Sequence, residues 1–259
     1  MITPQLKADE IYNDLLCRIA SRGNLSEFEY RKNLKLLNND KSSAAICAIG
    51  FAHALAGRND DSINWFKSFL PFSELFLLKG YGATLHFLGK DKKLIHLVLD
   101  YADYFSDIWF SWTCMEYYYT IGDIPNSARK ALEFLSMLPD NESKRHAEYS
   151  IHQQINSLSL VYDSGLCTPE QFKTIFNLAF DILEEYNKPY CYVELFYYEG
   201  DGASYEVGIV LDEDDFTTLS VLNKELIKRM MKKEELDNCE LTPCFSHDGM
   251  SHWRYIHAS

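Results

Sequence analysis

The chain has 259 residues, of which 47% are hydrophobic and 14% are aromatic, so it can bury a large core and is not a disordered protein. Its 25 basic and 38 acidic residues give a net charge of −13. Because phosphate backbones attract cationic surfaces, this charge argues against nucleic acid as the primary ligand and favours a basic protein or peptide.

Seven cysteines, an odd number, are scattered along the chain, and Cys47 and Cys114 fall inside apolar helical stretches. This pattern is typical of a reducing compartment, so we expect a cytoplasmic protein. The first ten residues lack the basic and apolar regions of a signal peptide. No uncharged apolar run reaches the ~18 residues of a membrane-spanning helix, and we expect no membrane partner. The sequence points to no cofactor and indicates no oligomeric state.

A first helical pair is predicted over residues 3–39. Apolar residues recur at helical spacing from Ile11 to Ile19, and Gly23 follows where that helix would end. Ser26 precedes Glu29 by three residues, which is the capping-box pattern that opens a helix. We therefore expect a second helix to begin there.

Two further helical hairpins are predicted over residues 44–105, and they carry glycine at corresponding places. Gly50 and Gly57 lie in the first hairpin, and Gly82 and Gly89 lie in the second, 32 residues later. The later glycine of each hairpin leads into a polar turn. A repeat of this length predicts stacked helical hairpins rather than a globular enzyme fold.

A fourth pair is predicted over residues 108–139 and a fifth over residues 142–186. Gly122 would end the first helix of the fourth pair, and Pro125 suits the first turn of the next helix. That next helix has four apolar residues at helical spacing, namely Ala128, Ala131, Leu132 and Leu135. In the fifth pair Gly165 ends a longer first helix, and Thr168 with Gln171 predicts the start of the second.

These five pairs resemble tetratricopeptide repeats, in a degenerate form. The glycines at the helix ends are 34, 32, 33 and 43 residues apart, against about 34 residues for one unit of that family. The second pair matches the family's pattern at Ile49, Gly50, Gly57, Ser62 and Phe66. The third matches at Tyr81, Gly82 and Gly89, with Leu94 and Val98 as departures. The fourth matches at Tyr118, Gly122, Ser127 and Pro139, with Met115 and Ala131 as departures.

The resemblance covers roughly residues 3–187. It implies a superhelical scaffold, an α-solenoid of about five antiparallel helical hairpins, that binds proteins. It implies no particular ligand.

Residues 188–259 are predicted to form a small ββαβ domain packed on the last repeat, and this part resembles no family. Two alternating segments flank the glycine-containing turn Glu199–Ala203 and predict a β-hairpin. A helix from Thr217 to Lys233 and a last strand around Glu240–Phe245 complete the domain. We expect one hairpin face to be buried against the helix, through Cys191, Val193, Leu195, Tyr197, Val207 and Ile209. Glu194 and Glu206 should lie on the opposite face.

Two stretches of this domain allow a metal site as an alternative. Cys239, Cys244, His247 and His252 supply the four donors of a structural zinc site, but the cysteines are spaced unlike a zinc knuckle. The other interpretation is a final strand followed by a polar tail. The acidic run Asp212–Asp215 lacks the glycine and distant glutamate of a calcium loop, and helix capping explains it equally.

The candidate partner-binding residues come from an analogy with tetratricopeptide arrays, in which the first helices line the concave surface. His53, His86, Trp112, Glu116 and Tyr119 are polar or aromatic in those helices. The two histidines could instead be satisfied between neighbouring helices. A second candidate surface is the acidic hairpin turn with Glu199 and Asp201.

The sequence contains no phosphate-binding glycine loop, nucleophile elbow or paired metal motif. We therefore expect a non-catalytic protein-interaction module. A narrower hypothesis is an acidic inhibitor or immunity protein that neutralises a basic partner, because residues 188–259 hold 14 acidic and only 7 basic residues. The alternative is a repeat scaffold that recruits a small metal-dependent or ligand-binding C-terminal domain.

Overall fold

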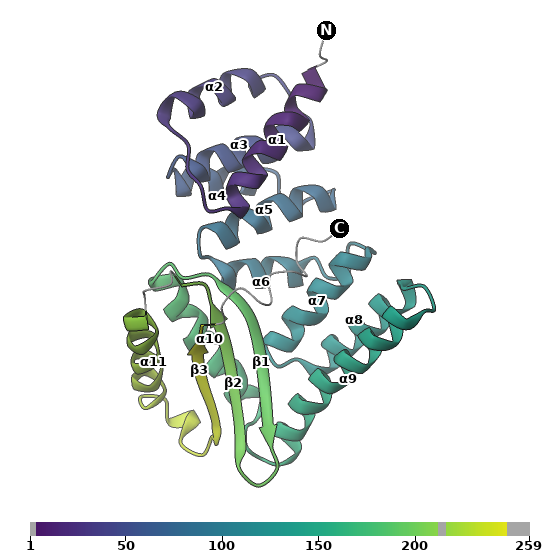
Figure 1. Cartoon of the computed structure of the whole chain (residues 1–259), viewed down its shortest axis with the longest axis vertical. Coiled ribbons are helices and arrows are strands. Elements are labelled where there is room, and N and C mark those ends of the chain that lie inside the picture. The colour runs from purple at the N-terminus through teal and green to yellow at the C-terminus, as the bar shows by residue number, and fades with distance from the viewer. Residues whose placement is uncertain (1–3, 212–215, 248–259) are drawn as a thin grey trace. The chain divides into compact units, whose positions relative to one another are not determined.

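The computed structural model describes residues 4–211 and 216–247 of the chain. These residues form eleven α-helices, one short 3-10 helix and three strands, so the chain is mainly helical with a small sheet, as predicted (Figure 1). It divides into two compact units, residues 1–94 and 95–259. The domain boundary that the composition predicts near residue 188 lies within the second unit and stays a prediction. None of the described helices has the length and hydropathy needed to cross a membrane.

The first unit is built around one apolar helix, α3. It contains α1 (Pro4–Ala20), α2 (Glu27–Leu37), α3 (Ser43–Leu55), α4 (Asn59–Lys67), α5 (Leu75–Phe87) and the start of α6 (Asp91–Asp100). Helix α3 packs against α1, α2, α4 and α5, and ten of its 13 residues are buried. The predicted capping box of Ser26 and Glu29 opens α2.

Three glycines that the sequence places at helix ends have that role. Gly57, Gly89 and Gly122 directly follow the C-caps of α3, α5 and α7 (Ile108–Thr120), with φ values of 73°, 63° and 80°. Glycine adopts this left-handed conformation without steric cost. Another helix begins two residues after each of them, so these predicted boundaries are confirmed.

One contact recurs between residues twelve positions apart on successive helices. The buried hydroxyl of Ser62 on α4 donates to the carbonyl oxygen of Gly50 on α3 at 2.8 Å. The buried hydroxyl of Ser127 on α8 (Ile124–Met137) donates to the carbonyl oxygen of Met115 on α7 at 3.1 Å. Leu94 on α6 lies against Gly82 on α5, where an added Cβ would be 3.0 Å from the leucine Cδ1. The same spacing thus gives the same packing position in three places.

The second unit continues with α7, α8, α9 (Glu142–Asp163) and α10 (Pro169–Glu185). Side chains at the N-caps of α7, α8 and α9 accept hydrogen bonds from the first helical turn. Helix α10 opens with the predicted capping box of Thr168 and Gln171 and with Pro169 in its first turn. Local sequence chemistry therefore determines where each of these helices begins.

The sheet consists of β1 (Tyr190–Tyr198), β2 (Gly202–Ile209) and β3 (Leu241–Ser246), in the order β1-β2-β3. Strands β1 and β2 are antiparallel, and α11 (Phe216–Met230) connects β2 to β3, which pair in parallel. Helices α10 and α11 lie on one face of the sheet (Figure 1). The side chains expected inside are buried there, among them Val193, Leu195, Val207 and Ile209. This part of the prediction is confirmed.

The predicted register fails at the start of β1. Cys191 was expected on the buried face, but a register shift between Tyr190 and Tyr192 interrupts the alternation. Tyr190 instead packs its ring against Phe180 of α10, with ring centroids 5.2 Å apart. Sequence alternation has no signal for such an irregularity, because a bulge changes the phase of only one strand.

Candidate partner-binding site

The two candidate histidines of the first unit have partners on neighbouring helices. Nδ1 of His53 lies 3.1 Å from the hydroxyl of Tyr30 on α2, and burial lowers the pKa of His53. Nδ1 of His86 lies 2.7 Å from the buried carboxylate of Asp91 at the start of α6. Both histidines therefore hydrogen-bond to a residue of a neighbouring helix, which is the alternative that the sequence left open.

Two aromatic candidates on α7 pack inside the second unit. The ring of Trp112 is partly buried, and its centroid lies 5.0 Å from that of Phe134 on α8. Tyr119 is 3% exposed, and its hydroxyl contacts the backbone of Leu195 on the edge strand β1. A buried ring offers a partner almost no surface, so Tyr119 is a poor candidate for partner binding.

Glu116, the third candidate on α7, faces α9 through one amide side chain. Nε2 of Gln154 donates to the Glu116 carboxyl at 3.4 Å, while the buried Oε1 of Gln154 has no hydrogen-bond partner among the described residues. Burial raises the pKa of Glu116 to about 7. The hydrogen bond from Gln154 favours the charged carboxylate, but burial outweighs it and favours the neutral acid.

The raised pKa makes a stability prediction for Glu116→Gln. The folded state holds the proton more tightly than the unfolded state, so the parent loses stability as the pH rises from about 4.5 to about 7. Gln cannot ionise, and the variant should be more stable than the parent at pH 8 by about 1–2 kcal/mol, with little difference at pH 4.5. Urea unfolding at both pH values measures this. Glu199→Gln at the exposed turn is the control, and equal stability of parent and Glu116→Gln at pH 8 would contradict the neutral form.

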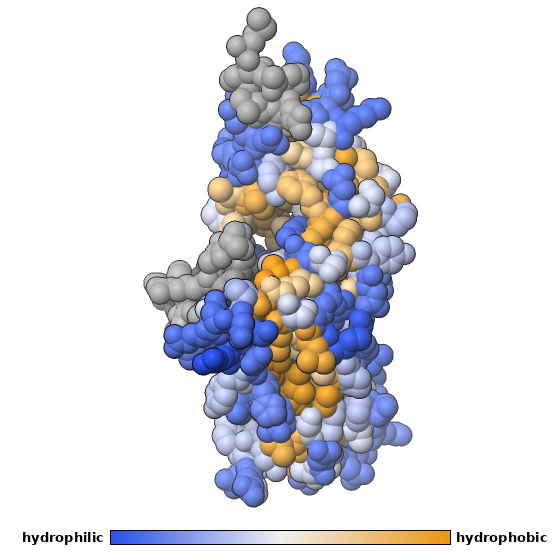
Figure 2. Space-filling model, turned by 90° about the vertical axis from the view of Figure 1, so that its right-hand side faces the viewer, coloured by the Kyte–Doolittle hydropathy of each residue, from blue (hydrophilic) through white to orange (hydrophobic). Residues whose placement is uncertain are grey.

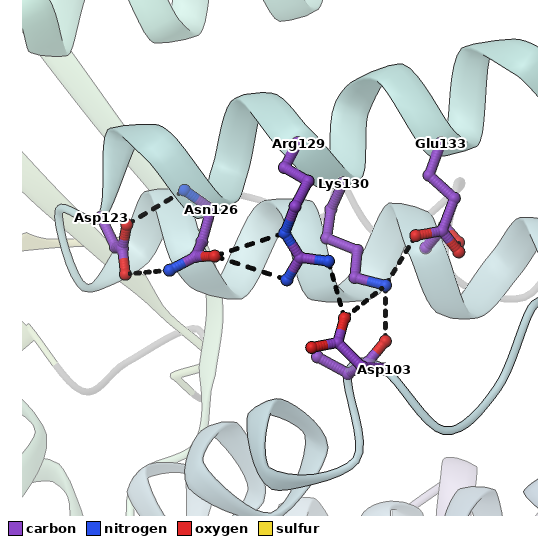
Figure 3. Close-up of polar contacts among 8 residues, drawn as sticks. Asp103, Asp123, Asn126, Arg129, Lys130 and Glu133 are labelled. Carbon is purple, nitrogen blue, oxygen red and sulfur yellow. Dashed lines mark hydrogen bonds and ion pairs between the residues drawn. The ribbon is translucent and has the colours of Figure 1, made fainter.

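Lys130 on α8 is a buried charge, only 2% exposed. Its ammonium group donates to the carbonyl oxygen of Ala102 at 2.5 Å and to Glu133 at 2.6 Å, and it lies 3.5 Å from Asp103 (Figure 3). Ser111 on α7 donates to the other Glu133 oxygen at 2.7 Å. Because every ammonium N–H has an acceptor within reach, the network indicates a structural role in joining α7 and α8 to the turn after α6.

The network extends along α8 toward its N-terminus. The guanidinium of Arg129 contacts Asp103 at 2.6 Å and the side-chain oxygen of Asn126 at 3.4 Å. Asn126 in turn is held by the N-cap residue Asp123, as Figure 3 shows. The hydrogen bond from Arg129 holds the pKa of Asp103 below its usual value. These groups are therefore bound to one another.

One of the four apolar residues at helical spacing in α8 lies outside the core. Leu132 is 71% exposed, whereas Ala131 is buried and Leu135 packs in the same cluster. Figure 2 looks onto the side of the second unit that carries α7, α8 and α9 in Figure 1, and hydrophobic residues form a band there.

The described part of the chain does not gather the residues of the zinc alternative. Cys239 contacts Cys167, Cys244 pairs in register with Glu206, and Nδ1 of His247 lies 3.5 Å from the carbonyl oxygen of Ile209. His252 and the acidic run Asp212–Asp215 lie outside the described residues. Within residues 4–211 and 216–247 no three potential ligands form a metal-binding group. Metal analysis of the purified protein tests this alternative.

The last two candidates, Glu199 and Asp201, are exposed together in the turn between β1 and β2. Gly200 (φ 84°) and Gly202 (φ 102°) supply the left-handed conformations of this tight turn. Beside it lies a surface hollow of about 400 Å³, which we call the acidic hollow. It is lined by Ser164, Leu166, Tyr197, Tyr198, Gly200, Asp201, Gly202 and Glu240.

Acidic residues line the acidic hollow. Asp201 and Glu240 come from the hairpin turn and from the segment before β3, and none of the described residues that line it is Lys or Arg. Ser164 is the C-cap of α9, so the negative end of that helix dipole lies beside the hollow. Sequence reasoning found Asp201 by its turn motif but missed Glu240, which is distant in the chain.

A second surface hollow, of about 380 Å³, lies on the outer side of α11 and has the opposite charge. Ile227 and Met231, which are 55% and 83% exposed, lie there among Lys224, Lys228 and Lys232. Lysines at helical spacing usually form a solvated face, so their pattern in the sequence does not by itself indicate a site. The helical spacing of Lys224, Lys228 and Lys232 was the only sign in the sequence that they lie on one face.

Comparison with protein-family models, with curated proteins and with solved structures found no match to this chain.

Proposed function

We propose that the chain is a protein-interaction module that binds a basic protein or peptide at the acidic hollow. The observation that carries the proposal is the composition of that hollow: two acidic residues and two tyrosines are among the residues around its volume of about 400 Å³, and no Lys or Arg of the described residues lines it. The net charge of −13 supports the same sign of partner.

The hollow suits the side chain of an arginine or a lysine. Its apolar stem can lie along Leu166 and one of the two tyrosines, and its charged head is complementary to Asp201 and Glu240. A cation over a tyrosine face gains further attraction from the ring electrons. We infer that a basic residue of the partner enters this hollow while the rest of the partner contacts the surface around it.

We further propose that the helices form a tetratricopeptide-like α-solenoid of about five antiparallel hairpins. The recurring twelve-residue contact supports this, because Gly50, Gly82 and Met115 meet Ser62, Leu94 and Ser127 in equivalent places. Such a scaffold offers a second surface to a large partner. The narrower proposal is an inhibitor or immunity protein that neutralises its basic partner.

Charge reversal tests the hollow. The partner is first captured by affinity at low salt, identified and purified, and its Kd for the parent is then measured. In the variant Asp201→Lys/Glu240→Lys, two attractive charges become repulsive, so the Kd should rise at least tenfold, or about 1.4 kcal/mol. Isothermal titration measures this change.

The matched control is Asp140→Lys/Glu148→Lys, which changes the net charge equally at exposed sites of the same unit. We expect its Kd to stay within about threefold of the parent value. Equal weakening of both variants would mean that only the total charge matters. Unchanged binding of the hollow variant would remove the hollow from the interface.

A further inference from the structure

Two cysteines that are distant in the chain meet beside the acidic hollow. Cys167 directly precedes the N-cap of α10, and Cys239 lies between the 3-10 helix (Glu234–Leu236) and β3. Each side chain is close enough to the other to shift its pKa. All seven cysteines are reduced in the structure.

The backbone around the two thiols holds them in place. The N–H of Glu240 donates to the carbonyl oxygen of Leu166 at 2.8 Å, so the two segments lie side by side at the residues next to the cysteines. Nε2 of Gln171 on α10 donates to the carbonyl oxygen of Glu235 at 2.9 Å, which joins the same segments a second time. A disulfide needs two cysteines on closely spaced segments, and these hydrogen bonds hold the segments of Cys167 and Cys239 together.

The two thiols differ in burial and in acidity. Cys167 is 1% exposed, whereas Cys239 is partly exposed. Hydrogen bonds from Cys167 and from the backbone of Leu241 lower the pKa of Cys239 to about 7, and the pKa of Cys167 is raised. The S–H of Cys167 also lies 3.3 Å from the carbonyl oxygen of Thr168. The accessible sulfur is therefore the nucleophile, and the buried one is placed to resolve it.

We propose that Cys167 and Cys239 form a reversible intramolecular disulfide when the protein meets hydrogen peroxide. The Cys239 thiolate attacks one peroxide oxygen, so that an S–O bond forms, the O–O bond breaks and hydroxide leaves. The sulfur of Cys167 then attacks the sulfur of Cys239, the S–O bond breaks, and water leaves with the proton of Cys167. The two thiols are oxidised and the peroxide is reduced to water.

The proposal does not depend on what the hollow binds. It has a consequence there, however, because Leu166 and Glu240 line the hollow and are the chain neighbours of the two cysteines. The disulfide would fix these two parts of its wall relative to each other.

Peptide mapping of the full chain tests the proposal. The reduced protein is treated with one equivalent of hydrogen peroxide, remaining thiols are alkylated, and digests are analysed by mass spectrometry. We expect one linked pair of peptides, containing Cys167 and Cys239, which disappears after treatment with a dithiol reductant. The linked protein should melt roughly 10 °C higher, because the bond closes a long loop in the unfolded chain.

Two variants and one internal reference complete the test. In Cys167→Ser, a first equivalent of peroxide should bring Cys239 to sulfenic acid and a second to sulfinic acid, without a link; in Cys239→Ser, Cys167 should stay reduced. Cys17 is exposed on α1 and serves as the reference for general oxidation. A parent protein in which Cys17 reacts while Cys239 stays reduced would overturn the proposal, and so would linkage of Cys239 to another cysteine or a lower melting temperature of the linked form. The outcomes that would overturn the proposal are all measured on the parent protein, so a variant that fails to fold leaves the test intact.

Discussion

Replacement of Ile209 by Asp is expected to unfold the second compact unit. Ile209 lies on the central strand β2, is 0% exposed, and belongs to an apolar cluster that includes side chains of α10 and α11. A carboxyl group placed there loses its water without gaining a partner, which costs several kcal/mol in either protonation state. A cost of this size is of the order of the whole stability of a domain.

Hydrogen exchange followed by mass spectrometry measures this effect for each unit. Peptides from β1, β2 and β3 should lose protection in Ile209→Asp, while peptides from α3 keep theirs. Thr242→Asp introduces the same charge on the exposed face of β3, and its stability should change by less than about 0.5 kcal/mol. If both variants kept full protection, the inward register of Ile209 would be wrong, since a shift by one residue reverses every strand side chain.

Features that depend on neighbouring residues could be predicted from the sequence. Ser26 with Glu29 and Thr168 with Gln171 begin helices because their chemistry acts over three residues. Gly57 ends a helix because the left-handed conformation is a property of one residue. The strand alternation gave the buried face for the same reason.

Features that depend on distant residues could not be predicted in this way. The burial of Lys130 on α8 depends on the carbonyl oxygen of Ala102, which accepts from its ammonium group and lies 28 residues earlier in the chain. The contact between Cys167 and Cys239 joins segments that no local pattern relates. The acidic turn was found as a second choice, but its hollow also needs Glu240 and Leu166. The net charge and the repeat length of the sequence indicate a class of partner. Tertiary packing decides which residues stay on the surface, where a partner can reach them.

Lys130→Met is expected to destabilise the helices of the second unit by about 3 kcal/mol. Met keeps most of the volume of the side chain but removes the ammonium group. The carbonyl oxygen of Ala102 and the carboxylate of Glu133 then lose their shared donor in a site that is only 2% exposed at Lys130. Hydrogen exchange of peptides from α7 and α8 measures the loss.

The pH dependence of this loss identifies the ion pair as its cause. Burial opposes ionisation of Glu133, but hydrogen bonds from Lys130 and Ser111 outweigh it and lower its pKa below 4.5. The parent therefore gains stability from this carboxylate above about pH 4.5 and loses it as the pH falls through the lowered value. The stability difference between parent and Lys130→Met should accordingly shrink in acid.

A double-mutant cycle separates the pair from the packing of the two side chains. Glu133→Leu removes the carboxylate, and Lys130→Met/Glu133→Leu replaces both charges with apolar groups. Since each single variant leaves one charge without its partner, the double variant should be at least about 1 kcal/mol more stable than the sum of the single losses predicts. Exposed pairs give much smaller couplings, and Arg31 with Glu27 on α2, at 2.7 Å, is the matched surface control. Additive losses at Lys130 and Glu133, with no change in acid, would show that the network does not hold α7 and α8 together.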